Sequence, residues 1–111
     1  MYQIKVSQDQ VGWTSLDLPG VSMKVLFKDD VSGAMTVVTR MEPGAIIPAH
    51  FHTQADETVY VLEGEFIEDG ESHGPGWYFV GKAGTPHGPH TTHGGCRVLT
   101  HFSAELDFQL A

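Results

Sequence analysis

The chain has 111 residues, of which 41% are hydrophobic and 18% are charged. This size and composition indicate one globular domain over residues 1–111, and no apolar run approaches the roughly 20 residues of a membrane-spanning helix. The net charge of −8 argues against a nucleic-acid partner, because phosphate groups would be repelled. With a single cysteine, Cys96, and no export signal at the N-terminus, we expect a cytoplasmic protein.

Short segments rich in β-branched and aromatic residues alternate with glycine and proline along the chain, which contains 13 Gly and 6 Pro. This pattern is typical of an all-β fold. In chain order, we expect strands at residues 3–6, 22–27, 34–41, 45–51, 58–62, 65–68, 76–80, 97–103 and 106–110. Residues 105–111 are short enough to form a helical turn instead. Many short strands with frequent turns predict a sandwich or barrel, commonly a jelly roll at this length.

Two connections between these strands have a distinct character. Glu63 and Gly64 separate two apolar segments, and Gly64 can adopt the positive φ of a tight turn, so we expect a hairpin there. Residues 69–76 contain no core-forming side chain. They predict an exposed connection, with His73 in solvent.

The most informative motif is a pair of histidines, His50 and His52, separated by one residue. Alternate side chains of a strand leave from the same face, so both imidazoles can reach one point. Glu57 follows shortly afterwards, and His87 lies further along the chain. Because imidazole and carboxylate groups are common metal ligands, these four side chains can hold one metal ion.

The spacing of this motif resembles that of a known family. Gly44, His50, His52, Glu57 and Gly64 fill every position of the first motif of the cupin superfamily. The resemblance implies a single-domain cupin with a jelly-roll β-barrel, whose metal motifs occupy residues 44–64 and 76–91. It also implies that the metal ligands are His50, His52, Glu57 and His87.

The second cupin motif is only partly present. Gly76, Gly84 and His87 match it, whereas Lys82 and Thr91 stand where the family usually has Pro and Asn. Neither of these two positions is a metal ligand. We therefore expect an unchanged ligand set and a locally different chain path.

The remaining histidines near the motifs lie outside the expected ligand set. His90 and His93 continue at three-residue intervals after His87, and their loop context predicts exposed or site-rim positions rather than metal ligation. His101 shares one strand face with Leu99, and the pattern does not show whether this face points inward. An inward His101 would be a candidate catalytic base.

The ligand set suits iron, nickel, manganese, zinc, cobalt or copper. Residues 83–90 and 61–66 are similar to the corresponding parts of acetylacetone-cleaving and hydroxyacetophenone-cleaving dioxygenases. This resemblance favours iron and implies a non-haem iron dioxygenase. Its small dicarbonyl or hydroxyaryl ketone substrate would chelate the metal, and dioxygen would be the second substrate.

Two other functions stay open. The metal could polarise a carbonyl group of a sugar acid in an isomerase, lyase or epimerase, which needs a base such as His101. The chain could also be a non-catalytic metal- or ligand-sensing module, similar to the cupin half of ChrR-like anti-sigma factors. We expect such a regulator to carry a separate partner-binding segment, for which this chain has no room. Proteins of this family commonly pair, so we expect a homodimer.

Overall fold

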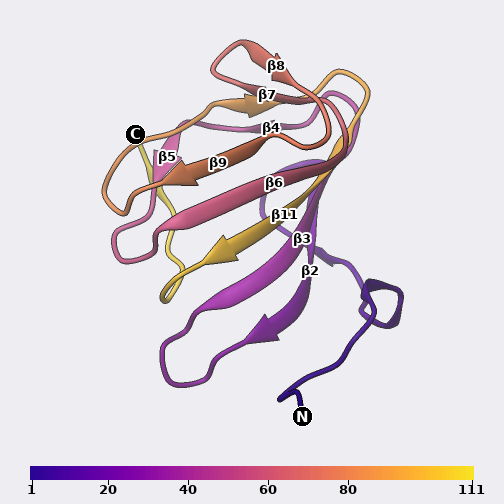
Figure 1. Cartoon of the computed structure of the whole chain (residues 1–111). Coiled ribbons are helices and arrows are strands. Elements are labelled where there is room, and N and C mark those ends of the chain that lie inside the picture. The colour runs from indigo at the N-terminus through magenta and orange to yellow at the C-terminus, as the bar shows by residue number, and fades with distance from the viewer.

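The computed structural model describes all 111 residues. It contains one short 3-10 helix, η1 (Gln8–Gln10), and strands that form two facing layers (Figure 1). The larger layer consists of β1 (Thr14–Ser15), β2 (Val21–Lys28), β3 (Met35–Met41), β6 (Glu57–Gly64), β9 (Tyr78–Gly81) and β11 (Cys96–Phe102). The other strands are β4 (Ile46–Ile47), β5 (His50–Phe51), β7 (Phe66–Glu68), β8 (Glu71–His73), β10 (His90–Thr91) and β12 (Gln109–Leu110).

Hydrogen bonds order these strands into three antiparallel sheets. The largest has the order β1-β2-β3-β11-β6-β9, the second has the order β4-β10-β7-β8, and β12 pairs with β5 alone. β11 lies between β3 and β6, although both precede it by many residues in the sequence. This all-β jelly-roll arrangement confirms the expected fold class. The ladders do not join into one continuous cylinder, so the two main layers form a sandwich.

The core between the layers follows from strand alternation. On β11, Val98, Thr100 and Phe102 are buried, whereas the residues between them are more exposed. Val59 and Val61 of β6 face the same interior and belong to the main hydrophobic cluster. The inner face of the larger sheet is thereby fixed, and it is the face that lines the site described below.

Most of the expected strands are confirmed, with corrections at both termini and at one proline. Residues 3–6 were expected to be a strand and are not, because no neighbouring strand offers them backbone partners. The expected strand 45–51 is divided at Pro48, since proline lacks the N–H group that a continuing ladder needs. In the final segment only Gln109–Leu110 is a strand, and residues 105–111 contain no helix.

The prediction of a hairpin at Glu63 and Gly64 is wrong. β6 and β7 belong to different sheets, so the chain turns a corner here instead of pairing with itself. Gly64 does have a positive φ of 79°. A Cβ at this position would overlap the carbonyl of Gly95. The glycine therefore allows the chain to pass from one layer to the other against a neighbouring backbone.

The exposed connection expected over residues 69–76 is also wrong in part. β8 pairs with β7 across a tight turn at Asp69 and Gly70, where both residues have positive φ. His73 is 9% exposed, and its ring centre lies 4.7 Å from that of Trp77. The sequence did not indicate this strand because His73 is the only one of its three residues that is buried.

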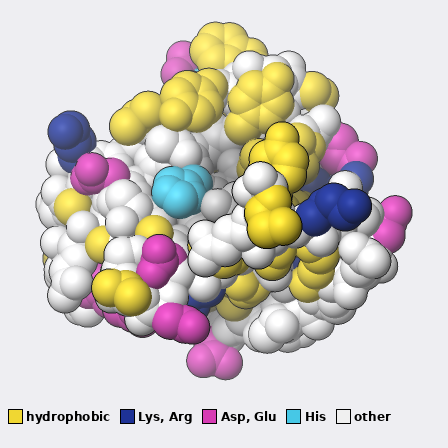
Figure 2. Space-filling view, turned by 60° about the horizontal axis from the view of Figure 1, so that its bottom comes forward, with side chains coloured by type: hydrophobic (Ala, Val, Ile, Leu, Met, Phe, Trp, Pro, Cys, Tyr) yellow, Lys and Arg dark blue, Asp and Glu magenta, His cyan; other side chains and the backbone are white.

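The outer face of the larger sheet is less completely covered than the inner face. Tyr60 of β6 and Tyr78 of β9 are opposite each other and are 45% and 58% exposed. Figure 2 shows exposed hydrophobic side chains gathered over part of one face of the molecule, with both acidic and basic side chains beside them. No helix of the structure has the length and apolar character needed to cross a membrane. The expected homodimer stays a prediction.

Replacing Gly64 with alanine is expected to destabilise the protein by at least about 2 kcal/mol, because the added Cβ meets the Gly95 backbone and also strains the positive φ. Gly70→Ala is the matched control. Gly70 has a φ of 84° but no atom within 4 Å of an added Cβ, so that only the strain of about 1 kcal/mol applies. Urea unfolding followed by circular dichroism measures both losses. Equal losses would contradict the tight corner.

Candidate metal centre

The two motif segments meet through their backbones. His50 is the first residue of β5, and His87 lies in the connection between β9 and β10. The N–H of His50 donates to the carbonyl of His87 at 2.9 Å, and the N–H of His87 donates to the carbonyl of His50 at 2.8 Å. This antiparallel bridge places the two imidazoles side by side. His52 follows β5, and Glu57 opens β6 on the same inner side.

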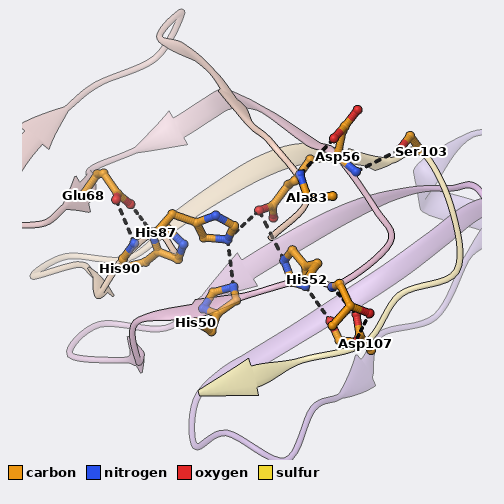
Figure 3. A network of polar contacts seen from close by, with 12 residues as sticks. His50, His52, Asp56, Glu68, Ala83, His87, His90, Ser103 and Asp107 are labelled. Carbon is orange, nitrogen blue, oxygen red and sulfur yellow. Dashed lines mark hydrogen bonds and ion pairs between the residues drawn. The ribbon is translucent and has the colours of Figure 1, made fainter. Parts of the chain in front are cut away.

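The structure brings the four expected ligands together. One ligand atom from each of His50, His52, Glu57 and His87 lies within 4.8 Å of the other three. His87 Nε2 is 3.0 Å from His50 Nε2 and 2.9 Å from Glu57 Oε2, and His52 Nε2 is 3.5 Å from the same oxygen. Figure 3 shows the three rings converging on one point. The cluster could therefore hold one metal ion.

Hydrogen bonds on the far side of two rings prepare them for this role. His50 Nδ1 donates to the Pro48 carbonyl at 2.7 Å, and His52 Nδ1 donates to the Asp107 carbonyl at 2.5 Å. A carbonyl oxygen can only accept, so each Nδ1 carries the proton and each Nε2 presents a lone pair to the cluster. This arrangement is typical of metal-binding histidines.

The donor set fits a divalent transition metal. His52 Nε2 is buried and has no hydrogen-bond partner, although a buried polar atom without one is costly. Three imidazole nitrogens and one carboxylate oxygen at this point are the donors that such ions prefer. A metal ion would satisfy the unpartnered nitrogen and balance the negative charge of Glu57.

Burial and neighbouring charges give the ligands different proton affinities. Burial lowers the pKa of His50 to about 4, and the adjacent histidines add to this effect. Burial also disfavours a charged His52, but its contacts with Glu57 and Asp107 outweigh this and raise the pKa of His52. Burial acts to raise the pKa of Glu57, but the contacts of its carboxylate with His52 and His87 overcome this effect and lower the pKa to about 2. Glu57 is therefore a carboxylate at neutral pH, and His50 is neutral.

A cavity of about 370 Å³ opens between the layers and ends on the cluster. Hydrophobic side chains make up most of its wall, and His50, His52 and Glu57 form its polar end. No lysine or arginine lines it, and its only carboxylates belong to Asp17 and Glu57. The cavity is thus suited to a small, largely apolar molecule without negative charge.

His90 is a third histidine that lines the cavity, beside His50 and His52. The loop position expected for it is wrong, because it lies on β10. Of the exposed or site-rim positions expected, only the second fits, since His90 is 7% exposed and lines the cavity. Its Nδ1 contacts the Glu68 carboxylate, which also accepts the N–H of Gly88 at 2.8 Å. Burial alone would raise the pKa of Glu68, but these contacts lower it. His93, in contrast, has an exposed side chain that contacts Glu65.

His101 does not face the cavity. The prediction that it is an inward catalytic base is therefore wrong. Its side chain is exposed on the outer face of β11 and lies 2.9 Å from the hydroxyl of Thr36 through Nδ1. The inward residues of this strand are Val98, Thr100 and Phe102. Because the site lies on the opposite side of the sheet, His101 has no access to a molecule in the cavity.

Three residues of the site were missed in the sequence. Glu68 carries a signal that could have been used, since it is an acidic residue on a strand close to the His-rich loop. Asp107 contributes through its main-chain carbonyl, for which side-chain chemistry gives no signal. Phe108 stacks on His50 with ring centres 4.3 Å apart, a contact that depends on the path of the C-terminal segment.

In the metal-free protein, His50 is expected to titrate near pH 4 and His52 above its ordinary pKa. His50 thus stays neutral and ready to bind a metal down to about pH 4, whereas protons compete for His52 at higher pH. The affinity for Zn²⁺ should consequently fall as the pH drops through the pKa of His52. NMR titration of the imidazole signals measures both midpoints, and equal midpoints would contradict the arrangement described above.

The chain matches the ChrR cupin-like domain over residues 2–105. No curated protein matches it. Among solved structures, KdgF from Halomonas is 27% identical, with a TM-score of 0.75 and coverage of 89% of this chain and 91% of that chain. The polyketide cyclase RemF from Streptomyces resistomycificus is 21% identical, with a TM-score of 0.81 and coverage of 99% and 86%. A candidate acetylacetone dioxygenase from Methylibium petroleiphilum is 19% identical, with a TM-score of 0.75 and coverage of 93% and 78%.

The last two likenesses concern the fold alone. The family match extends over nearly the whole chain and includes all four residues of the metal cluster. The protein belongs to the ChrR cupin-like family.

Proposed function

We propose that the protein is a metal-dependent enzyme of the non-haem iron dioxygenase type. Its substrate would be a small neutral dicarbonyl or hydroxyaryl ketone. The observation that carries this proposal is the apolar cavity of about 370 Å³ that ends on the cluster of three histidines and one glutamate. A neutral ketone fits the apolar wall, and its two oxygens could chelate a metal held by these four side chains.

The residues of the chain have separate roles in this proposal. His50, His52, Glu57 and His87 would hold the metal, which supplies Lewis acidity and binds the two oxygens of the substrate. The hydrophobic wall excludes water and orients the carbon skeleton. In the overall reaction one carbon–carbon bond breaks and both oxygen atoms of dioxygen enter the products. The substrate provides all the electrons, so no external reductant is needed.

The lining of the cavity argues against the sugar acid considered from the sequence. A carboxylate substrate is normally recognised by lysine or arginine, and neither lines the cavity. Asp17 would repel an anion, and only the metal would attract one. His101, the base considered for that reaction, lies on the outer face.

A second candidate function is proton-transfer chemistry on the same class of neutral ketone, as in an isomerase or lyase. The observation that favours it is the pair formed by His90 and Glu68. His90 lines the cavity, and its Nδ1 contacts the Glu68 carboxylate. Such a pairing leaves the other ring nitrogen free to hold or release a proton next to a bound molecule.

Protein purified without added metal is expected to contain about one iron ion per chain, which elemental analysis measures. His52→Ala should lower the affinity for Fe²⁺ by at least about 100-fold, because it removes a ligand and leaves a void at the cluster. His93→Ala is the matched control, because the His93 side chain is 87% exposed and lies outside the cluster. Equal affinities of the two variants would contradict the proposed ligand set.

Oxygen uptake with the iron-loaded protein is expected for neutral β-diketones and hydroxyaryl ketones, and not for uronates. His90→Gln separates the two candidate reactions. Cleavage with oxygen uptake that survives this substitution supports the dioxygenase, whereas oxygen-independent conversion that is lost in the variant supports proton transfer. Metal binding without any turnover would contradict both reactions and favour the sensing module.

A further inference from the structure

The C-terminal segment, residues 106–111, forms part of the metal centre without supplying a ligand. After β11 the chain reverses at Ser103, whose N–H donates to the Asp56 carbonyl at 3.0 Å. The segment then runs beside β5, with Gln109 opposite Phe51 and Leu110 opposite His50. It thereby lies against the strand that carries the first metal ligand.

Asp107 makes two kinds of contact within this segment. Its carboxylate accepts the N–H of Thr53 at 2.8 Å and the hydroxyl of Thr53 at 2.7 Å. Its main-chain carbonyl accepts His52 Nδ1 at 2.5 Å, a contact that Figure 3 shows beside the cluster. The side chain of Asp107 therefore fixes the position of the carbonyl that orients the His52 ring.

The neighbours of Asp107 form part of the cavity wall. Leu106 and Phe108 both line the cavity. The Phe108 ring lies against His50 with an angle of 22° between the two planes. One short segment thus contacts two metal ligands and closes one side of the cavity.

Apart from the packing of Leu106 and Phe108, few backbone contacts hold this segment in place. β12 has only two residues and pairs on one side with β5, which is equally short. Segments with so few backbone hydrogen bonds open at low free-energy cost. The two hydrogen bonds between Asp107 and Thr53 are the side-chain contacts that tie this segment to the residue after His52.

We propose that Asp107 is a positioning residue that couples closure of the C-terminal segment to the geometry of the metal centre. The coupling works in both directions, since a contact that favours metal binding in the closed state makes metal binding favour closure. The metal side of this inference rests on the proposed role of the cluster. The orientation of His52 belongs to the metal-free protein and does not depend on it.

The test compares Asp107→Ala with Asp29→Ala, using Zn²⁺ as the probe. Asp29 is the matched control, because its carboxylate accepts the N–H groups of Val31 at 2.8 Å and Ser32 at 3.2 Å in a connection outside the cavity. Asp107→Ala should lower the affinity for Zn²⁺ about 10- to 100-fold, as expected for the loss of a group that orients a ligand. Asp29→Ala should bind Zn²⁺ as tightly as the wild-type protein. Isothermal titration calorimetry measures all three affinities.

Hydrogen exchange tests the reverse direction of the coupling. Zn²⁺ should slow exchange of the amides of Leu110 and Ala111 in the wild-type protein, and it should slow them less in Asp107→Ala. Thr53→Ala removes the hydroxyl donor to Asp107 and keeps all four ligands. It should show the same changes to a smaller extent, with folding of each variant checked by its dispersed NMR spectrum.

The tautomer of His52 provides a readout that needs no metal. Long-range ¹⁵N NMR of the neutral ring should show Nδ1–H alone in the wild-type protein and a mixture of tautomers in Asp107→Ala. Wild-type Zn²⁺ affinity together with an unchanged tautomer in that variant would overturn the inference. If the wild-type protein itself does not bind Zn²⁺, the proposed metal site fails, and an unchanged tautomer would then also overturn the positioning role of Asp107.

Discussion

Two backbone hydrogen bonds join His50 to His87, and the other parts of the metal centre are arranged around them. β5 contains only two residues, because the chain breaks at Pro48, and such a strand would have little order of its own. Its backbone pairs with His87 on one side and with β12 on the other. Both neighbours come from distant parts of the sequence. The geometry of the first two ligands is therefore a property of the completed fold and not of the local motif.

Electrostatics explains why such a cluster is compatible with a buried position. Four ionisable groups at one end of an apolar cavity would be costly if each were charged. Burial keeps His50 neutral, and the carboxylate of Glu57 is stabilised by two imidazoles instead of by water. The remaining cost falls on His52, whose Nε2 is buried and unpartnered. A bound cation removes this cost, which links the stability of the fold to occupation of the site.

The sequence predicted the fold class and the four residues of the metal cluster, because their spacing matches the cupin motifs and the structure brings them together. Orientation across sheets was less accessible. Whether His101 points inward depends on which face of β11 the rest of the chain covers, and His90 is buried only because β10 pairs with β4 and β7. Gly64 illustrates a further limit, since its positive φ serves equally well in a hairpin and in the corner that is present.

The absence of lysine and arginine from the cavity also affects what happens after a reaction. Oxidative cleavage of a neutral dicarbonyl compound would produce a carboxylic acid, which loses its proton at neutral pH. A molecule that enters without charge would then become an anion near Asp17, and apart from the metal the cavity has no cation to hold it. The same wall that accepts the substrate would repel the product. Departure of the product would be driven by the charge that the chemistry creates, in a protein whose net charge of −8 adds to the repulsion.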